Sequence, residues 1–212
     1  MKIIAWDLET IRDTSKISIL QEPKPDKRMT DPVKIEKDIA KKMEEAIEIM
    51  GLNPATAMIC CFGWFDGSKA GSIMLEEESP EAEKALLKKA WDVLKDANQV
   101  VTFNGFNFDV PVLLMRSILC RVKPTLTINR KRYTTLNHYD ARMVLGNWDT
   151  YAKGDLNFYS NLLLGKSAKD EMSGDMVQEY WSMGLKDDIA TYCESDCKTT
   201  FEIFDLISKY YL

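Results

Sequence analysis

Residues 3–10, with the sequence Ile-Ile-Ala-Trp-Asp-Leu-Glu-Thr, decide the fold. The apolar run at the start is typical of a strand inside a sheet, and alternation along a strand puts Asp7 and Glu9 on one face. Two neighbouring carboxylates at the end of a buried strand are costly to ionise. A divalent cation is the usual compensation, because Mg²⁺ and Mn²⁺ prefer oxygen ligands. Because Asp-x-Glu also occurs by chance in surface loops, this motif alone does not establish a metal site. Further carboxylates downstream are needed to support one.

The composition is that of a globular protein. The chain has 212 residues, of which 45% are hydrophobic and 29% are charged, enough for one domain with a sizeable core. No apolar stretch approaches the roughly 18 residues of a membrane helix. The N-terminus shows no basic leader followed by an apolar signal core. We therefore expect one domain over residues 1–212 in a cytoplasmic protein with no membrane partner.

Histidine and cysteine are poor candidates for catalysis or zinc binding. No cysteine spacing matches a zinc knuckle, and Cys60 and Cys61 lie in an apolar strand. Cys193 and Cys197 share one helix face, which suggests a metal pair, but no partner motif accompanies them, so packing is favoured. His138 is the only histidine, and no nucleophile elbow or reactive-cysteine motif is present for it to serve.

Charge is distributed unevenly along the chain. The net charge of −5 argues against a protein that coats nucleic acid through its overall charge. Between Val110 and Tyr139, however, there is no acidic residue, and the basic residues there are Arg116, Arg121, Lys123, Arg130, Lys131 and Arg132. This segment is either a solvated loop or a local phosphate-binding stretch.

Periodicity and turn residues predict the order of the elements. An Asp31-Pro32 cap, an Asp66-Gly67 hairpin turn and a Ser79-Pro80 cap are the clearest signals. The predicted elements are a strand at 2–7, a loop at 12–30, a helix at 31–51, strands at 56–65 and 68–75, a helix from 79 to about 98, a strand at 99–103, a helix from about 109, and helices at 156–164, 175–183 and from 186. Residues 130–139 form either a hairpin arm or an irregular loop. This order predicts an α/β fold with a mixed central β-sheet flanked by helices.

Two further motifs carry carboxylates. In Asn104-Gly105-Phe106-Asn107-Phe108-Asp109, Asn-Gly predicts a tight turn and Asp109 begins a helix, whose dipole favours negative charge. Capping of that helix is the structural alternative for Asp109. In Tyr192-Cys193-Glu194-Ser195-Asp196, the i to i+4 spacing puts Tyr192 and Asp196 on one helix face, beside the apolar stripe. A semi-buried carboxylate with no basic partner nearby in sequence again favours a metal.

In this order, Asp-x-Glu, Asn-x-x-x-Phe-Asp and Tyr-x-x-x-Asp resemble the motifs of the DEDD superfamily of 3′-to-5′ exonucleases. The tyrosine resembles the DEDDy branch, that of the proofreading domains of family B DNA polymerases. Residues 164–167, 172–174 and 189–196 are similar to stretches of stand-alone, phage-like versions. The resemblance covers nearly the whole chain and implies an RNase H-like (DnaQ-like exonuclease) fold. Two points differ: Cys197 stands where relatives often carry valine, and the loop and helix at about 12–53 are more elaborate than in the minimal domain.

The resemblance also implies a site. Asp7 would bridge two divalent ions, Mg²⁺ or Mn²⁺, Glu9 and Asp196 would complete one ion site, and Asp109 would hold the other. Two such ions can supply the attacking hydroxide, stabilise the phosphoryl oxygens and assist the leaving 3′-oxygen. Tyr192 would orient the attacking water, since a phenol with a pKa of about 10 is a poor base at neutral pH.

The expected substrate contacts are less closely tied to the chemistry. The candidates are Leu8, Thr10, Asn104, Phe108, Arg130 and Arg132. Phe106 offers a face on which a base can stack, whereas core packing is the alternative for Phe108. Asp140 is a carboxylate near the site that matches no ligand position, so we expect it to support the ligands or the fold.

We therefore expect a metal-dependent 3′-to-5′ exonuclease that acts on single-stranded DNA ends, in the cytoplasm of a bacterium or a phage-infected host. With no polymerase domain in the sequence, proofreading would be done in trans, with a DNA polymerase as partner. An exoribonuclease is an alternative, because nothing in the sequence reports a contact to the 2′-hydroxyl. A non-catalytic nucleic-acid or polymerase-binding module on the same fold is another. Such a module would have no need of all five motif residues.

Overall fold

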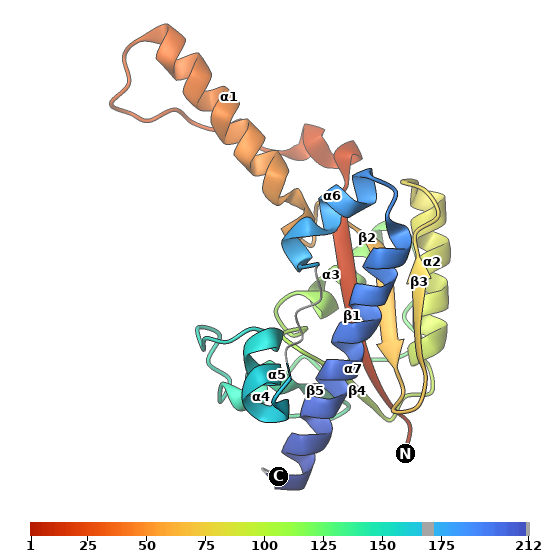
Figure 1. Ribbon diagram of the computed structural model, residues 1–212. Helices are drawn as coiled ribbons and strands as arrows, with labels where there is room; N and C mark the ends of the chain where they lie inside the picture. The colour runs from red at the N-terminus through yellow and green to blue at the C-terminus, as the bar shows by residue number, and fades with distance from the viewer. Residues whose placement is uncertain (167–171, 211–212) are drawn as a thin grey trace.

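The computed structural model describes residues 1–166 and 172–210, which form a sheet of five strands covered by helices. The strand order is β3-β2-β1-β4-β5. The long helix α7 crosses one face of the sheet, and α2 and α3 lie on the other (Figure 1). This mixed sheet flanked by helices is the RNase H-like fold that the sequence predicts.

Strands and helices are mixed along the first 140 residues, and only helices follow β5 in the part of the chain that the structure describes. Their bounds are β1 Ile3–Arg12, η1 Thr14–Ile19, α1 Pro32–Glu48, η2 Ile49–Leu52, β2 Ala57–Phe65, β3 Ala70–Met74, α2 Pro80–Leu94, β4 Gln99–Thr102, α3 Asp109–Leu119, β5 His138–Asp140, α4 Ala141–Leu145, α5 Leu156–Leu164, η3 Gly174–Met176, α6 Val177–Ser182 and α7 Lys186–Tyr210.

The central strand β1 is longer than the sequence indicates. It continues five residues past the predicted end at Asp7, because it pairs antiparallel with β2 as far as Arg12. Asp7 and Glu9 therefore lie within the strand and not at its end. On its other side, β1 pairs with β4 only through Ile3–Ala5. Beyond Ala5, that edge of β1 is open to groups from other elements.

Residues 13–52 form an arm that extends from the body of the molecule (Figure 1). As predicted, Asp31 caps α1 and Pro32 is its first residue. The segment predicted as a loop at 12–30 is partly regular, because Arg12 ends β1 and a 3-10 helix follows. The helix also ends earlier than predicted, at Glu48, and Gly51 lies in η2. No residue of α1 is buried.

The remaining predictions hold with small shifts. The β2–β3 hairpin and the bounds of α5 agree with the sequence, whereas α2 ends at Leu94 and the helix predicted at 175–183 divides into η3 and α6. Residues 130–137 form an irregular loop and not the arm of a hairpin. Besides η1, two further elements were not predicted: β5, which pairs parallel with β4, and α4. Ser167, within one of the stretches that carry the resemblance, lies outside the described residues.

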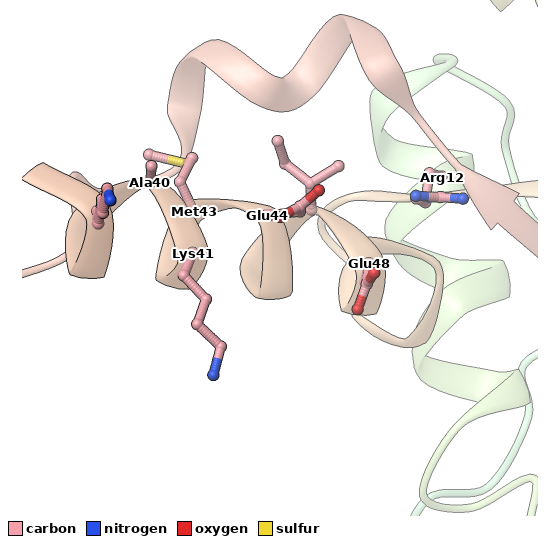
Figure 2. A pocket seen from close by; sticks show the side chains of 8 residues that line it. Arg12, Ala40, Lys41, Met43, Glu44 and Glu48 are labelled. Atoms are coloured by element: carbon pink, nitrogen blue, oxygen red, sulfur yellow. The ribbon is translucent and has the colours of Figure 1, made fainter.

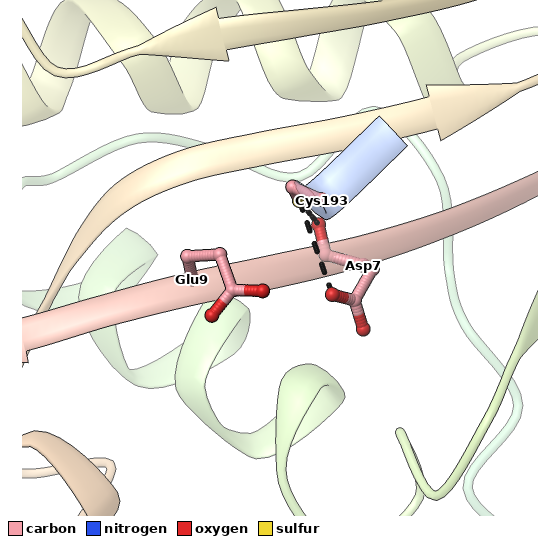
Figure 3. Close-up of side chains that lie close together, drawn as sticks. All are labelled: Asp7, Glu9 and Cys193. Carbon is pink, nitrogen blue, oxygen red and sulfur yellow. Dashed lines mark hydrogen bonds between the residues drawn. The ribbon is translucent and has the colours of Figure 1, made fainter. Parts of the chain in front are cut away.

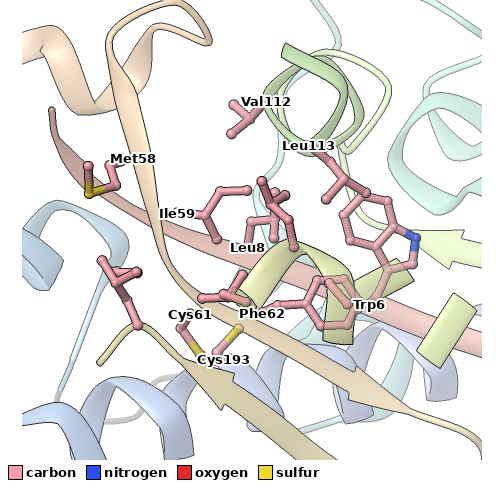
Figure 4. Close-up of a cluster of buried hydrophobic side chains, with 14 of the residues drawn as sticks. Trp6, Leu8, Met58, Ile59, Cys61, Phe62, Val112, Leu113 and Cys193 are labelled. Carbon is pink, nitrogen blue, oxygen red and sulfur yellow. The ribbon is translucent and has the colours of Figure 1, made fainter. Parts of the chain in front are cut away.

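The core lies mainly between the sheet and the α2–α3 layer. Trp6 stacks on Phe62 with ring centroids 5.7 Å apart, and Leu8 and Leu113 pack beside them (Figure 4). All five cysteines are buried with free thiols, as expected from packing. His138 is also buried, between the Thr102 hydroxyl and the carbonyl of Asn129. None of the described helices is both long and apolar enough to span a bilayer.

Candidate active site

Four carboxylates from three elements meet at the centre of the sheet. Asp7 and Glu9 come from β1, Asp109 from the first residue of α3, and Asp196 from the middle of α7. Glu9 and Asp109 are buried, whereas Asp7 and Asp196 are partly exposed. Figure 3 shows Asp7 and Glu9 projecting from the same side of β1. Elements far apart in sequence therefore bring together the carboxylates of the three motifs.

Burial is the main cause that raises the pKa values of Asp7, Glu9 and Asp109. Burial raises the pKa of Asp7 well above its ordinary range, and the charges of Asp109, Glu9 and Asp196 raise it further. The pKa of Glu9 is raised mainly by burial and also by Asp196 and Asp109. Burial raises the pKa of Asp109 to about 7, although hydrogen bonds from backbone N–H groups oppose the shift. Without counter-charge, the cluster holds protons that isolated carboxyl groups would release.

Asp109 is held against the open edge of β1. Its Oδ1 accepts a hydrogen bond of 3.1 Å from the backbone N–H of Leu8. The helix cap itself is Phe108, which makes no side-chain capping bond. Asp109 is therefore not an N-cap. Its side chain is directed at Leu8 of the central strand, the residue between Asp7 and Glu9.

Helix α7 approaches the sheet closely at Gly63, which pairs with Asp7 across β1 and β2. A Cβ atom at Gly63 would lie 2.6 Å from Cys193 Sγ and 3.0 Å from its carbonyl oxygen, so only glycine leaves room for the helix. The Cys193 thiol donates to the backbone oxygen of Asp7 at 3.6 Å (Figure 3). This contact sets the depth at which Tyr192 and Asp196 meet β1.

Tyr192 is suited to orient groups and not to remove protons. Burial and the negative charges of Asp196, Glu9 and Asp7 raise its pKa well above 10, and a hydrogen bond with Asp196 adds to the shift. Its hydroxyl therefore stays protonated at any physiological pH, and it can donate or accept a hydrogen bond beside the carboxylates.

The ligand set fits divalent cations. Among the described residues, Asp7, Glu9 and Asp109 form no ion pair with lysine or arginine. One oxygen each of Asp7 and Glu9 and the Cys193 sulfur lie within 4.8 Å of one another. Buried carboxylates without a basic partner are stabilised by hard cations, which take oxygen ligands.

A pocket of about 310 Å³ opens beside the carboxylates. Three of the predicted substrate residues, Leu8, Thr10 and Phe108, line it together with Glu9. The rest of its wall was not predicted: Gly174, Asp175 and Gln178 from η3 and α6, Arg12, and Glu48, Gly51 and Leu52 from the arm. No sequence motif marks the arm residues, because only the fold brings the base of the arm to β1.

A second pocket, of about 830 Å³, lies along α1 and shares Arg12 and Glu48 with the first (Figure 2). Lys37 and Lys41 line its outer part. The Thr10 hydroxyl donates to the carbonyl of Gly51 at 2.7 Å, and Arg12 donates to Gln178. These bonds fasten the arm and α6 to the end of β1.

The turn after β4 is fixed by two charged side chains. The carboxylate of Asp140 accepts hydrogen bonds from the N–H groups of Asn104 at 3.0 Å and Phe106 at 2.7 Å. Arg142 donates to Oδ1 of Asn104 at 3.1 Å. Asn104 adopts a φ of 65°, which suits the tight turn. Asp140 thus supports the fold, and Asn104 lies outside the lining of the pocket, with its side-chain oxygen bonded within the turn.

The basic stretch is not a single surface. Arg116 is buried and pairs with Glu83 and Asp13, so the expectation that it belongs to an exposed basic segment is wrong. The reason is that Arg116 faces the core side of α3, where two carboxylates neutralise it. Arg130 and Arg132 are exposed, and Arg132 donates to the carbonyl of Trp148 at 3.2 Å. Neither lines the pocket.

Residues 55–209 match the sequence profile of a family described as "Predicted 3'-5' exonuclease related to the exonuclease domain of PolB". The chain belongs to this family. The matched region contains Asp109, Tyr192 and Asp196, whereas Asp7, Glu9 and the arm precede it. Membership makes the chain a predicted 3′-5′ exonuclease, of a kind that is typically metal-dependent and acts on nucleic acid.

Structural comparison finds a similar fold in part of a DNA polymerase. The fold is similar to the family B DNA polymerase of the hyperthermophilic archaeon Pyrobaculum calidifontis, with a TM-score of 0.65 and 13% sequence identity. The match covers 98% of this chain and 24% of the polymerase, so the likeness concerns the fold of one part of that protein. A search among curated proteins finds no match.

Proposed function

We propose that this exonuclease removes nucleotides from the 3′ end of single-stranded DNA with the help of two divalent ions. The observation that carries the proposal is the convergence of four electrostatically coupled carboxylates beside a pocket, with no basic partner for Asp7, Glu9 or Asp109 among the described residues. Such a cluster is stable near neutral pH only with bound cations or bound protons.

Each carboxylate has a distinct place in this proposal. Asp7, whose carboxylate feels the charges of Asp109, Glu9 and Asp196, would hold both ions. Glu9 and Asp196 would complete one ion site, and Asp109, fixed by its bond to Leu8, would hold the other. Bound there, Mg²⁺ or Mn²⁺ would activate the attacking water and stabilise the charge that develops on the phosphoryl oxygens.

Tyr192 would position the water and not deprotonate it. Its hydroxyl, beside Asp196, has a pKa too high for a general base at neutral pH. The pocket formed by Leu8, Thr10 and Phe108 would receive the terminal nucleotide. We also propose that residues 1–212 act as one cytoplasmic exonuclease domain that proofreads in trans for a DNA polymerase.

The test is a gel assay with 5′-labelled single-stranded DNA and RNA of equal sequence. We expect stepwise shortening of the DNA in Mg²⁺ or Mn²⁺ and no reaction in EDTA. Release of the label as a mononucleotide at the earliest times would show the opposite polarity and contradict the proposal. Preferential shortening of the RNA would identify an exoribonuclease instead.

The variant Asp7→Ala tests the proposed role of Asp7 as a ligand of both ions. It should abolish cleavage and leave the fold intact, with a metal-free protein at least as stable as the wild type, because a repulsive charge is removed. Asp92→Ala, which changes an exposed carboxylate on α2, is the control and should cleave normally. Wild-type turnover by the Asp7 variant, in a preparation free of other nucleases, would exclude the two-ion assignment.

A further inference from the structure

Three aromatic rings form a series next to the turn that precedes Asp109. Phe106 meets Trp148 edge to face, with ring centroids 6.0 Å apart. Trp148 in turn contacts Tyr133, with centroids 5.8 Å apart and planes inclined by 52°. Phe106 is three residues before Asp109, and exposure increases from the half-buried Phe106 and Trp148 to the exposed Tyr133.

The outer rings are displayed to solvent. The side chain of Tyr133 is 74% exposed, and Trp148 is half-buried. Both residues have positive φ angles, 62° and 63°, which bulky residues seldom adopt. Backbone strain of this kind persists where the surrounding structure imposes it, and it concentrates at binding sites.

The loop that carries Trp148 is anchored to the turn beside the active site. Arg142 donates to the carbonyl of Gly154 at 3.2 Å, to the carbonyl of Ala152, and to Oδ1 of Asn104. The backbone N–H of Trp148 donates to the carbonyl of Met143 at 2.6 Å. The loop with Trp148 is therefore held in place before any ligand arrives, which lowers the entropic cost of binding.

Basic residues adjoin the rings, and Arg132 donates to the carbonyl of Trp148. Arg130, Lys131 and Arg132 precede Tyr133, and all three are exposed. The acidic groups nearby are Asp149, whose Oδ1 accepts the Tyr151 N–H, and Asp140, which is buried and bonded to backbone N–H groups. Exposed aromatic rings beside basic side chains are the combination that binds single strands, since every base has a face for stacking.

We infer that Tyr133 and Trp148 form a stacking platform for bases of the single strand whose 3′ end enters the active site, with Arg130 and Arg132 against its phosphates. The identity of that strand as the substrate rests on the proposed function. The platform deepens the proposal by assigning a site for nucleotides upstream of the scissile bond, outside the pocket beside the carboxylates.

The experiment measures binding in EDTA, where no cleavage occurs. A fluorescent single-stranded oligonucleotide carries one abasic nucleotide, which is moved stepwise from the 3′ end, and anisotropy gives the dissociation constant. For wild type, we expect an abasic nucleotide at one or two internal positions to weaken binding on the order of tenfold, as the loss of one stacked base does. A dissociation constant independent of the abasic position would overturn the inference.

The variant Tyr133→Ala should weaken binding of the intact oligonucleotide by a similar factor and abolish the position dependence. Tyr151→Ala is the matched control, because Tyr151 is 89% exposed on the same loop as Trp148. It should bind as wild type does, and an equal loss in both variants would overturn the inference. Trp148→Phe, which keeps a ring, should bind more tightly than Trp148→Ala at equal thermal stability.

Failure of the platform can be told apart from failure of the proposed function. Cleavage of the intact oligonucleotide by wild type in Mg²⁺ is measured in parallel. Position-dependent binding without cleavage would support the platform and contradict the exonuclease proposal. Cleavage without position-dependent binding would support the exonuclease proposal and contradict the platform.

Discussion

The backbone N–H of Leu8 donates a hydrogen bond of 3.1 Å to the carboxylate of Asp109. This bond joins the central strand to the first residue of α3 across the edge that β4 leaves free. It fixes the position of Asp109 Oδ1. The structural and the proposed chemical roles of Asp109 can thus be separated by substitution.

Asp109→Asn keeps an oxygen that can accept the Leu8 N–H but removes the charge. We expect its stability to be close to wild type and its cleavage to fall on the order of 10²-fold or more. Asp109→Ala removes the acceptor as well and should lower the free energy of unfolding by about 1–2 kcal/mol relative to Asp109→Asn. Urea unfolding and single-turnover cleavage measure the two effects. Equal stability of the two variants would show that the bond contributes nothing.

The raised pKa values predict how stability depends on pH in the metal-free protein. Asp109 titrates near pH 7 when folded and near its ordinary value of 3.8 when unfolded, so between these values the folded state binds more protons. The contribution of Asp109 to the free energy of unfolding is therefore fully present below about pH 4. It is lost as the pH rises toward 7, by at most about 1.4 kcal/mol per pH unit for one group. Asp109→Asn should flatten this slope in EDTA. Addition of Mg²⁺ at pH 8 should restore stability, and an unchanged melting temperature would contradict the assignment of the site.

Tyr192→Phe tests whether the hydroxyl orients the attacking water. The ring packing and the carboxylates are kept, so metal affinity should stay near wild type while cleavage slows on the order of 10²-fold. Asp196→Ala should lose both metal affinity and cleavage. Tyr180→Phe, on α6, is the control. Single-turnover rates at saturating metal decide, and a wild-type rate for Tyr192→Phe would make Tyr192 a packing residue.

Gly63→Ala tests the approach of α7 to the sheet. A Cβ atom 2.6 Å from Cys193 Sγ and 3.0 Å from a backbone oxygen must displace the helix, which should destabilise the protein by about 1–3 kcal/mol. Cleavage should fall further than stability explains, because Asp196 moves with α7. At Gly51 the nearest atom to a new Cβ is 3.5 Å away, so Gly51→Ala should change stability far less. Similar melting curves for the two variants would refute the close-packing argument.

Arg130→Ala combined with Arg132→Ala tests the exposed part of the basic stretch. Each phosphate contact that is lost should reduce the slope of log affinity against log salt by about 1, with no change in the metal requirement. Lys95→Ala, at the residue that follows α2, is the control for a general change of charge. An unchanged slope in the double variant would show that this segment does not meet the strand.

Local sequence determined most of the elements and all members of the candidate carboxylate cluster. Asp31-Pro32 and Asp66-Gly67 specify a helix start and a hairpin through backbone preferences that act within a few residues, and the structure has both. The Asp-x-Glu, Asn-x-x-x-Phe-Asp and Tyr-x-x-x-Asp motifs likewise identify the side chains that converge, because their residue types and order are written in the chain.

Tertiary structure decided what depends on partners distant in sequence. β1 extends to Arg12 because β2 pairs with it, β5 exists as a strand because β4 lies beside it, and Arg116 is buried because Glu83 and Asp13 neutralise it. The arm residues in the pocket and the Tyr133–Trp148 contact are of the same kind. These features depend on contacts between segments that no local periodicity records, so they emerge only when the sheet assembles.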